Sequence, residues 1–371
     1  MSEATRPATP EDGAHMRRAL ALAARGWGQT APNPMVGAVV VRDGEVVGEG
    51  WHTQLGAPHA EVEALRDAGA RAKGATVYVT LEPCNHHGRT GPCTEALLAA
   101  GVARVVAAIA DPHPVAQGGA ARLREAGLEV RVGVEEVGAR ELNAPFLHAI
   151  TSDRPFVELK MAVSLDGAIA DHTRQQAWLT GPASRAEVHR LRAGADAVAV
   201  GIGTVLADDP ALTVREGTPP RVPPLRVVFD TSARLPLMSR LARTARDTPV
   251  LVVCWAPDPA HAAALEHTGV ELLHAATLSH ALRALKGRGI HSLLVEGGAA
   301  LASSLLQEAL VDRLVIFRAP LFVGAGSLPA FGGLPAATVD QARRWRVTRT
   351  ARFGDDEMTV YAPLDSGAGA I

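Results

Sequence analysis

Cysteine, histidine and arginine side chains gather in one short segment of the chain, VTLEPCNHHGRTGPC, which spans residues 79–93 and begins on an apolar run. Upstream, the segment PHAEVEAL contributes His59. One imidazole and two thiolates form a ligand set that suits Zn²⁺, and three protein ligands leave the fourth tetrahedral position open for water. An open position distinguishes a catalytic zinc from a structural one. We therefore predict a catalytic zinc site formed by His59, Cys84 and Cys93.

Glu61 follows the predicted ligand His59 by two residues. A bound zinc ion lowers the pKa of its water to about 7, and a carboxylate that does not bind the metal can carry a proton from water to a leaving amine. H-x-E followed by P-C is the pattern of zinc-dependent base deaminases. Two alternatives remain open: Glu61 only favours the helix dipole, or His87 completes a closed structural site as a fourth ligand.

Short β-rich runs alternate with Ala/Leu/Arg-rich helical stretches around these side chains, and this alternation indicates an α/β protein. We expect a helix, a hairpin turning at Asp43-Gly44, a helix, a strand, a helix and a strand, at residues 11–25, 36–52, 59–69, 75–80, 93–101 and 103–110. The second helix would hold His59 and Glu61 in its first turn, so both side chains should project beyond its N-terminus.

A second series of strands follows a polar, proline-containing joint, AITSDRPF. At 371 residues the chain is too long for one ordinary core, so we expect two domains, at residues 1–151 and 152–371. The strands of the second series are predicted in FVELKMAV, ADAVAVG, LRVVFD, PVLVVCWA, HSLLVEGG, DRLVIFRA and EMTVYA. Cys254 lies within one of these apolar runs and is predicted to be an inert core residue.

Composition argues against several classes of function. With Lys+Arg 37 against Asp+Glu 39, the chain has no basic surplus for binding nucleic acid or an anionic membrane. Three cysteines are too few for a disulfide framework, and the N-terminal MSEATRPATPEDG lacks the apolar core of a signal peptide. No uncharged run approaches the roughly 18 to 20 residues needed to cross a bilayer. We expect a cytoplasmic protein with no nucleic-acid or membrane partner.

A strand in SLLVEGGAALASSLLQ is predicted to run into Gly297-Gly298 and then into a helix. Glycines at such a junction let the backbone approach a pyrophosphate, and the helix N-terminus offers N–H groups to the anion. No G-x-G-x-x-G follows a strand in this part of the chain, so a Rossmann-type fold is not indicated.

Three blocks of the first domain, NPMVGAVVV, HAEVEAL and TLEPCNHHGRTGPC, resemble the deaminase half of a bifunctional riboflavin-biosynthesis family. This family joins diaminohydroxyphosphoribosylaminopyrimidine deaminase to 5-amino-6-(5-phosphoribosylamino)uracil reductase. The insertion NHHGRTG, which widens the usual cysteine spacing, is similar to the family's substrate loop. In the second domain, LKMAVSLDGAIA, WLTG, LRAGADAVAVGIGTVLADDPALTVR and VEGG resemble the reductase half. The resemblance implies an N-terminal zinc cytidine-deaminase-like α/β/α domain followed by a dihydrofolate-reductase-like α/β domain.

The resemblance also implies two consecutive steps of riboflavin synthesis. In the first, water activated by zinc attacks the amino-bearing C2 of 2,5-diamino-6-(5-phosphoribosylamino)pyrimidin-4(3H)-one, Glu61 moves protons and ammonia leaves. In the second, NADPH transfers a hydride to C1′ of 5-amino-6-(5-phosphoribosylamino)uracil and the ribosyl group opens to ribityl. The implied cofactors are Zn²⁺ and NADPH, the implied partners are these small-molecule substrates, and the family suggests a homo-oligomer.

The family's functional residues can be carried over by motif. In the deaminase half, the substrate contacts fall on Asn33, His52, His86 and Arg89. In the reductase half, the substrate contacts fall on Gln176, Arg192, Leu212, Arg215 and Glu296, where the planar arginine fork suits a ribose phosphate. The NADPH contacts fall on Ala162, Trp178, Thr204, Asp208, Gly298, Ala299, Ala300, Leu301, Ala302, Ser303 and Ser304. Asp208 is also predicted to be catalytic, and Lys160 to be a proton donor or an orienting charge.

Several of these positions also have an explanation without a function. Asn33 can form an Asx turn, and Asp208 a plain turn with its neighbours. Arg192 can face solvent on its helix, Lys160 can face solvent on its strand, and Trp178 can anchor a core.

The sequence disfavours two competing functions. A nucleoside or tRNA deaminase fused to a degenerate reductase is disfavoured by the long Cys84–Cys93 loop and by the near-neutral charge. A non-catalytic zinc scaffold is disfavoured by Glu61, because a scaffold has no use for a proton carrier beside an open metal.

Overall fold

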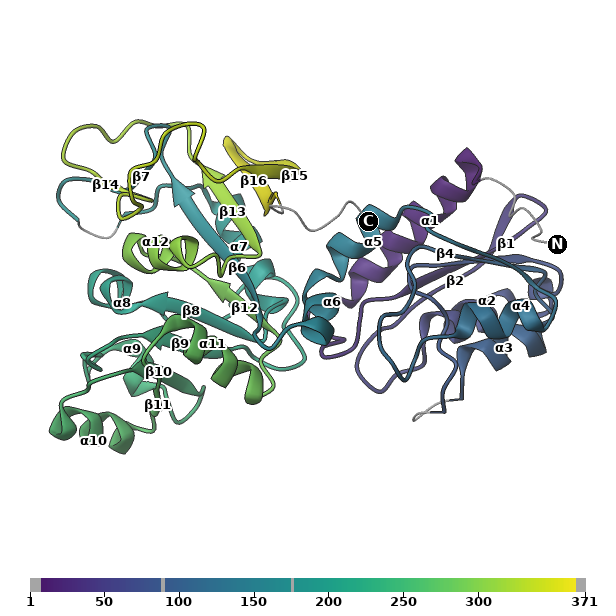
Figure 1. Cartoon of the computed structure of the whole chain (residues 1–371), viewed down its shortest axis with the longest axis horizontal. Coiled ribbons are helices and arrows are strands. Elements are labelled where there is room, and N and C mark those ends of the chain that lie inside the picture. Colours follow the sequence, from purple (N-terminus) through teal and green to yellow (C-terminus); the bar gives the residue numbers. More distant parts are fainter. Residues whose placement is uncertain (1–7, 88–90, 175–176, 365–371) are drawn as a thin grey trace. The chain divides into compact units, whose positions relative to one another are not determined.

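The computed structural model describes residues 8–87, 91–174 and 177–364. It contains two compact units, Met1–Thr151 and Ser152–Ile371 (Figure 1). Each unit has its own sheet with helices packed against it, which confirms the predicted α/β class.

In the described part of the first unit, a five-stranded sheet has the order β2-β1-β3-β4-β5. The strands are β1 (Gly37–Arg42), β2 (Glu45–Trp51), β3 (Thr76–Val79), β4 (Arg104–Ala107) and β5 (Glu129–Val132). β1 pairs antiparallel with β2 and β3, whereas β3, β4 and β5 run parallel. The helices are α1 (Pro10–Ala23), α2 (Ala60–Ala68), α3 (Cys93–Ala100), α4 (Gly119–Glu125), α5 (Glu136–Leu142) and α6 (Ala144–Thr151).

Both faces of this sheet are buried because side chains alternate along each strand. In β1, Val40 packs with α2, α3 and α4 on one face, and Val39 packs with α1 and α5 on the other. The result is a three-layered α/β/α unit, with α1 and α5 on the opposite side of the sheet from α2, α3 and α4 (Figure 1). This double burial explains why the strand sequences are nearly continuous apolar runs.

Glycines in the hairpin bring α2 close to the sheet. A Cβ on Gly48 would lie 2.4 Å from the carbonyl oxygen of Ala64, and a Cβ on Gly50 would lie 2.5 Å from the carbonyl oxygen of Ala60. Any larger residue would push the helix away from β2. The two glycines therefore set the position of the helix that begins beside His59.

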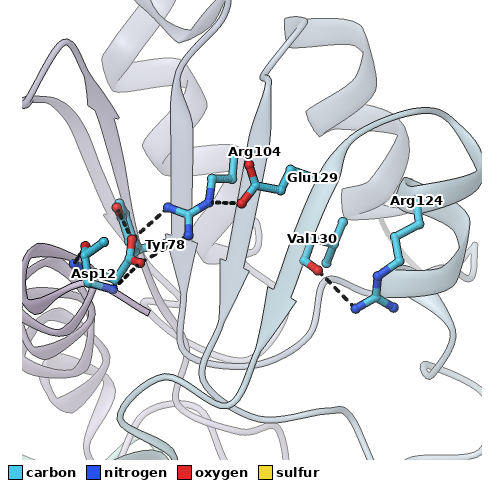
Figure 2. A network of polar contacts seen from close by, with 7 residues as sticks. Asp12, Tyr78, Arg104, Arg124, Glu129 and Val130 are labelled. Atoms are coloured by element: carbon cyan, nitrogen blue, oxygen red, sulfur yellow. Dashed lines mark hydrogen bonds and ion pairs between the residues drawn. The ribbon is translucent and has the colours of Figure 1, made fainter. Parts of the chain in front are cut away.

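A polar network ties α1 to three strands (Figure 2). Asp12 is 1% exposed and accepts hydrogen bonds from Tyr78 Oη at 2.8 Å and from Arg104 Nη1 at 2.7 Å. Arg104 also donates to Glu129 on β5 at 2.8 Å. Burial alone would raise the pKa of Asp12, but the hydrogen bond from Arg104 brings it well below its usual range. The carboxylate is therefore held in its charged form inside the unit.

Replacing Asp12 with Ala is expected to destabilise the first unit by about 3 kcal/mol, because Tyr78 would lose its acceptor and the poorly exposed Arg104 would keep only Glu129 as a partner. Since the folded pKa of Asp12 is lowered, its stabilisation is present above about pH 4 and is lost as the pH falls. Urea unfolding at pH 7 measures the loss. Glu125→Ala, at the exposed end of α4, is the matched control and should change the unfolding free energy by less than about 0.5 kcal/mol.

In the described part of the second unit, a nine-stranded sheet has the order β11-β10-β9-β8-β12-β6-β13-β16-β15 and a two-stranded sheet pairs β14 with β7. In this sheet order, all strands from β11 through β13 run parallel to one another. β16 pairs antiparallel with β13, and β15 pairs antiparallel with β16. The strands are β6 (Phe156–Val163), β7 (Ala168–Ala170), β8 (Ala197–Gly201), β9 (Leu225–Phe229), β10 (Val250–Cys254), β11 (Glu271–His274), β12 (Ser292–Val295), β13 (Arg313–Arg318), β14 (Leu328–Pro329), β15 (Trp345–Phe353) and β16 (Asp356–Pro363).

Helices cover both faces of the larger sheet. They are α7 (Pro182–Ala193), α8 (Ile202–Asp208), α9 (Arg240–Arg243), α10 (Pro259–Thr268), α11 (Leu278–Gly287) and α12 (Ala299–Gln307). One core contains side chains of α7, α9 and α10, and the other contains side chains of α11 and α12. Cys254 is buried in the first of these cores and forms no disulfide, which confirms that prediction.

Candidate active sites

Three predicted zinc ligands meet at the ends of two helices and one strand. His59 is the N-cap of α2, Cys93 is the first residue of α3, and Cys84 lies in the loop after β3. His59 Nδ1 lies 3.1 Å from Cys93 Sγ and 3.5 Å from Cys84 Sγ. All three ligand atoms lie within 4.8 Å of one another. The two helix starts and the strand end therefore bring the imidazole and both thiols to one point.

This donor set fits a zinc ion. Zn–S bonds of about 2.3 Å and Zn–N bonds of about 2.1 Å place the donors of a tetrahedral site roughly 3.6 Å apart. The hydrogen bond from Cys93 lowers the pKa of Cys84 to about 4, so a thiolate is favoured at this position. Among the described residues, the ligand group does not include His87, which is exposed. The alternative of a structural site closed by His87 therefore has no support in the geometry.

Glu61 lies beside this group without belonging to it. The carboxylate is on the first turn of α2, is 3% exposed and lines a pocket together with His59 and Cys84. Burial raises the pKa of Glu61, and the neighbouring His59 opposes that shift. A carboxyl group with a raised pKa both accepts and returns a proton more readily near neutral pH.

Asn33 and His52 lie on the same pocket and are hydrogen-bonded to each other. His52 Nδ1 lies 3.1 Å from the carbonyl oxygen of Pro58, which can only accept, so Nδ1 carries the proton. Burial lowers the pKa of His52, so the ring is neutral and its Nε2 accepts from Asn33 Nδ2 at 3.2 Å. Asn33 therefore offers its Oδ1, a hydrogen-bond acceptor, to the pocket.

The structure adds pocket residues that the sequence reasoning missed. His86 lines the pocket as expected, whereas the predicted contact Arg89 lies outside the described residues. Asp111 and His113, after β4, also line the pocket, as does Phe146 of α6. The parallel pairing of β3 and β4 was the available signal, because it places the loops after both strands at the same edge of the sheet.

A second pocket lies in the second unit, where β6, β8 and β12 run side by side. The predicted residues that line it are Lys160, Ala162, Trp178, Arg192, Thr204, Asp208, Arg215, Glu296 and Gly298. Glu296 and Gly298 follow the carboxyl end of β12. β8 leads into α8, which contains Thr204 and Asp208. Ligands of open parallel sheets bind at this edge.

Arg192 and Glu296 form the central ion pair of this pocket. Arg192 Nε and Nη2 donate to the two carboxylate oxygens of Glu296 at 2.5 and 2.8 Å, and Nη1 donates to the carbonyl oxygen of Thr213. Burial alone would raise the pKa of Glu296, but the charge of Arg192 brings it below its usual value. The alternative of a solvent-facing Arg192 is wrong, because the side chain is largely buried and bidentate.

Lys160 lies in the same pocket and does not face open solvent. Burial lowers the pKa of Lys160, and the charge of Glu296 opposes this shift. His189 also lines the pocket, although no sequence motif indicated it, and its Nδ1 accepts from the backbone N–H of Arg215 at 3.2 Å. Burial raises the pKa of Asp208, which ends α8.

The structure corrects several of the remaining expectations for this pocket. Trp178 is 69% exposed with Arg185 over its ring, so the core-anchor alternative is wrong. Leu212 is buried in the core rather than at the pocket surface. Of the stretch from Gly298 to Ser304, only Gly298 lines the pocket, and Leu301, Ala302 and Ser303 are buried within α12. Gln176 lies outside the described residues.

Comparisons with known proteins agree with this division. The RibD C-terminal domain family matches residues 155–358, and the cytidine and deoxycytidylate deaminase zinc-binding region matches residues 9–109. The riboflavin biosynthesis protein RibD of Aquifex aeolicus is 43% identical over 350 residues, which cover 94% of this chain and 97% of that protein.

Solved structures give the same result. RibD of Acinetobacter baumannii superposes with a TM-score of 0.81 at 39% identity, covering 96% of this chain and 99% of that one. The diaminohydroxyphosphoribosylaminopyrimidine deaminase/5-amino-6-(5-phosphoribosylamino)uracil reductase of Thermotoga maritima superposes with a TM-score of 0.82 at 36% identity, covering 95% and 99%.

Among the residues that the structure describes, no helix combines the length and the apolar character needed to cross a membrane. The substrates are small molecules, and the cofactors are Zn²⁺ for the deaminase and NADPH for the reductase. With two matched domains and high similarity along almost its whole length, the chain belongs to the RibD family of bifunctional riboflavin-biosynthesis enzymes, which join a deaminase to a reductase.

Proposed function

We propose that residues 1–151 perform the deamination, with His59, Cys84 and Cys93 as the zinc ligands and Glu61 as the proton carrier. The observation that carries this assignment is the convergence of three ligand atoms within 4.8 Å beside a buried carboxylate that is not one of them. When bound by three protein ligands, zinc supplies a water of lowered pKa. The chain's own residues then have two tasks, which are to move protons and to hold the base.

Glu61 moves the protons. Its carboxylate takes one proton from the attacking water and passes it to the ring nitrogen beside C2. It then carries the proton of the new C2 hydroxyl to the amino group, which leaves as ammonia while a carbonyl forms on the ring. Burial raises the pKa of Glu61, so the side chain can hold a proton between one transfer and the next. Asn33 Oδ1 accepts from an N–H of the base, and the adjoining His52 holds that amide in place. His86 and Arg89 contact the base or the phosphate.

Residues 152–371 perform the reduction in the second pocket. NADPH supplies the hydride that reaches C1′ of the ribosyl group, and one proton must reach the ring oxygen as the C1′–O bond opens. Lys160 or Asp208 delivers that proton, since both line the pocket. Arg215 and Arg192 bind the phosphorylated substrate, together with Glu296. The dinucleotide lies along Ala162, Trp178, Thr204, Asp208 and Gly298, which precedes α12.

The test follows ammonia release and NADPH absorbance separately. Supplied with the diaminopyrimidine substrate alone, the enzyme should release ammonia without NADPH, and NADPH oxidation should begin only after deamination. Oxidation of NADPH by the diamino compound in a chain that cannot deaminate would contradict the proposed order.

Glu296→Gln should lower the reductase kcat/KM by about 100-fold, because Arg192 loses its buried partner and the pocket loses its geometry. Glu296 opposes the lowering of the Lys160 pKa, so its removal should lower that pKa further. If Lys160 donates the proton, the alkaline limb of the reductase pH profile should therefore move to lower pH. The matched control is Glu308→Gln, an exposed residue just after α12, which should leave the profile unchanged.

We further propose that the enzyme works in the cytoplasm and assembles as a homo-oligomer. The support is the family to which the chain belongs. Sedimentation of the purified enzyme measures the assembly, and a monomer at working concentrations would contradict it.

A further inference from the structure

The loop that carries Asn33 is held by a residue from the other end of the first unit. Asn143 lies between α5 and α6 and is 2% exposed. Its Oδ1 accepts from the backbone N–H of Met35 at 2.8 Å, and its Nδ2 donates to the carbonyl oxygen of Met35 at 2.9 Å. One side-chain amide thus pairs with both polar backbone groups of a residue 108 positions away in the sequence.

Met35 is two residues after Asn33, so its backbone sets where the Asn33 side chain begins. On its other side the loop is tied to the hairpin, where His52 N–H donates to the carbonyl oxygen of Val36 at 2.9 Å and His52 Nε2 accepts from Asn33. The loop therefore has two independent anchors, His52 from β2 and Asn143 from the junction of α5 and α6.

The same junction contributes to the pocket wall. Phe146, one helical turn after Asn143, lines the pocket that holds Glu61 and the zinc ligands. The match to the general deaminase zinc-binding region ends at residue 109, so Asn143 and Phe146 lie beyond the part of the chain that is similar to it. An element outside the general zinc region is a suitable place for features that belong to this substrate.

We propose that Asn143 is a positioning residue of the deaminase, which fixes the Met35 backbone and thereby the position of Asn33 Oδ1 against the base. The inference rests on the proposed contact between Asn33 and the substrate. Asparagine offers one acceptor and one donor in a single plane, which matches the N–H and C=O of one residue. Alanine offers neither, and aspartate presents a second acceptor to the carbonyl oxygen of Met35.

The test is a double-mutant cycle in the full-length, zinc-loaded enzyme. Asn143→Ala should lower the deaminase kcat/KM by about 10- to 100-fold, since a displacement of about 1 Å in a substrate-positioning group has an effect of this size. Asn143→Asp should also be impaired. In the Asn33→Ala background, Asn143→Ala should add less than about threefold, because the group through which it acts is already gone. Val137→Ala, at a position of α5 that is 77% exposed, is the control and should match the wild type.

Two further readouts separate positioning from general damage. The zinc content per chain and the reductase rate on pre-deaminated substrate should stay unchanged in both Asn143 variants. The inference would be overturned by any of three results. These are an equal effect of Asn143→Ala with and without the Asn33 side chain, loss of zinc in both Asn143 variants, or no effect of Asn143→Ala on deamination. A silent Asn33→Ala would also overturn it, and only that result removes Asn33 from the proposed function.

Discussion

Glu61→Gln lowers the deamination rate by about 10² to 10⁴-fold, because the amide can neither take a proton from water nor return it to the leaving amine. The side chain keeps its size, and the proposed zinc ligands His59, Cys84 and Cys93 are untouched, so the metal content should stay at the wild-type level. Reduction of pre-deaminated substrate should proceed normally, because the second pocket lies in the other unit. Ammonia release and NADPH oxidation, measured separately, give the two rates.

Glu63→Gln is the matched control. Glu63 shares the first turn of α2 with Glu61 and pairs with Arg66 at 2.7 Å, but it does not line the pocket. If Glu61 only favoured the helix dipole, both substitutions would have the same small effect, on the order of 0.3 to 1 kcal/mol in stability. Equal deamination rates in the two variants would therefore remove Glu61 from the mechanism.

Cys93→Ser is expected to remove zinc and to reduce deamination to background. Cys93 is fully buried as the first residue of α3, 3.1 Å from His59 Nδ1, and a serine hydroxyl is a poor replacement for a thiolate ligand. Elemental analysis of the purified variant measures the zinc, and the reductase rate of the same sample shows whether the rest of the chain is intact. Treatment of the wild type with a chelator should give the same loss, and added Zn²⁺ should restore the activity.

Cys254→Ser is the control for this result. Cys254 is equally buried but lies in the core of the second unit, and burial raises the pKa of its thiol. The variant should keep full zinc content and full deamination, with at most a modest loss of stability. Full zinc occupancy in Cys93→Ser, with a normal ammonia rate, would show that the metal is held elsewhere.

Local patterns predicted most of the elements around the first site. The hairpin turns at Asp43 and Gly44, where both residues have positive φ, 52° and 82°, as the Asp-Gly pair indicates. The first helix, expected over residues 11–25, spans Pro10–Ala23. These features depend on hydrophobic period, turn chemistry and capping within a few residues, so a single sequence carries them.

Other elements gave no such local signal. β15 consists of WRVTRTARF, a basic and largely exposed run without clear alternation. It is a strand because β16 pairs with it along its whole length. At the edge of a sheet, charged residues of this kind also discourage pairing with other chains. The short helix α4 and strand β11 were likewise absent from the prediction, since they have only seven and four residues and too few apolar positions to show a period.

The sequence by itself determined the zinc chemistry, because His59, Glu61, Cys84 and Cys93 lie within short motifs whose spacing limits what they can bind. Only the tertiary structure decided which side chains from distant segments of the chain contact each other. Arg192 meets Glu296 across 104 residues, Asn143 meets Met35 across 108, and Leu212 turns into the core instead of the pocket. Such contacts depend on which strands lie side by side and which faces are buried, and these are properties of the packed chain rather than of any short stretch of it.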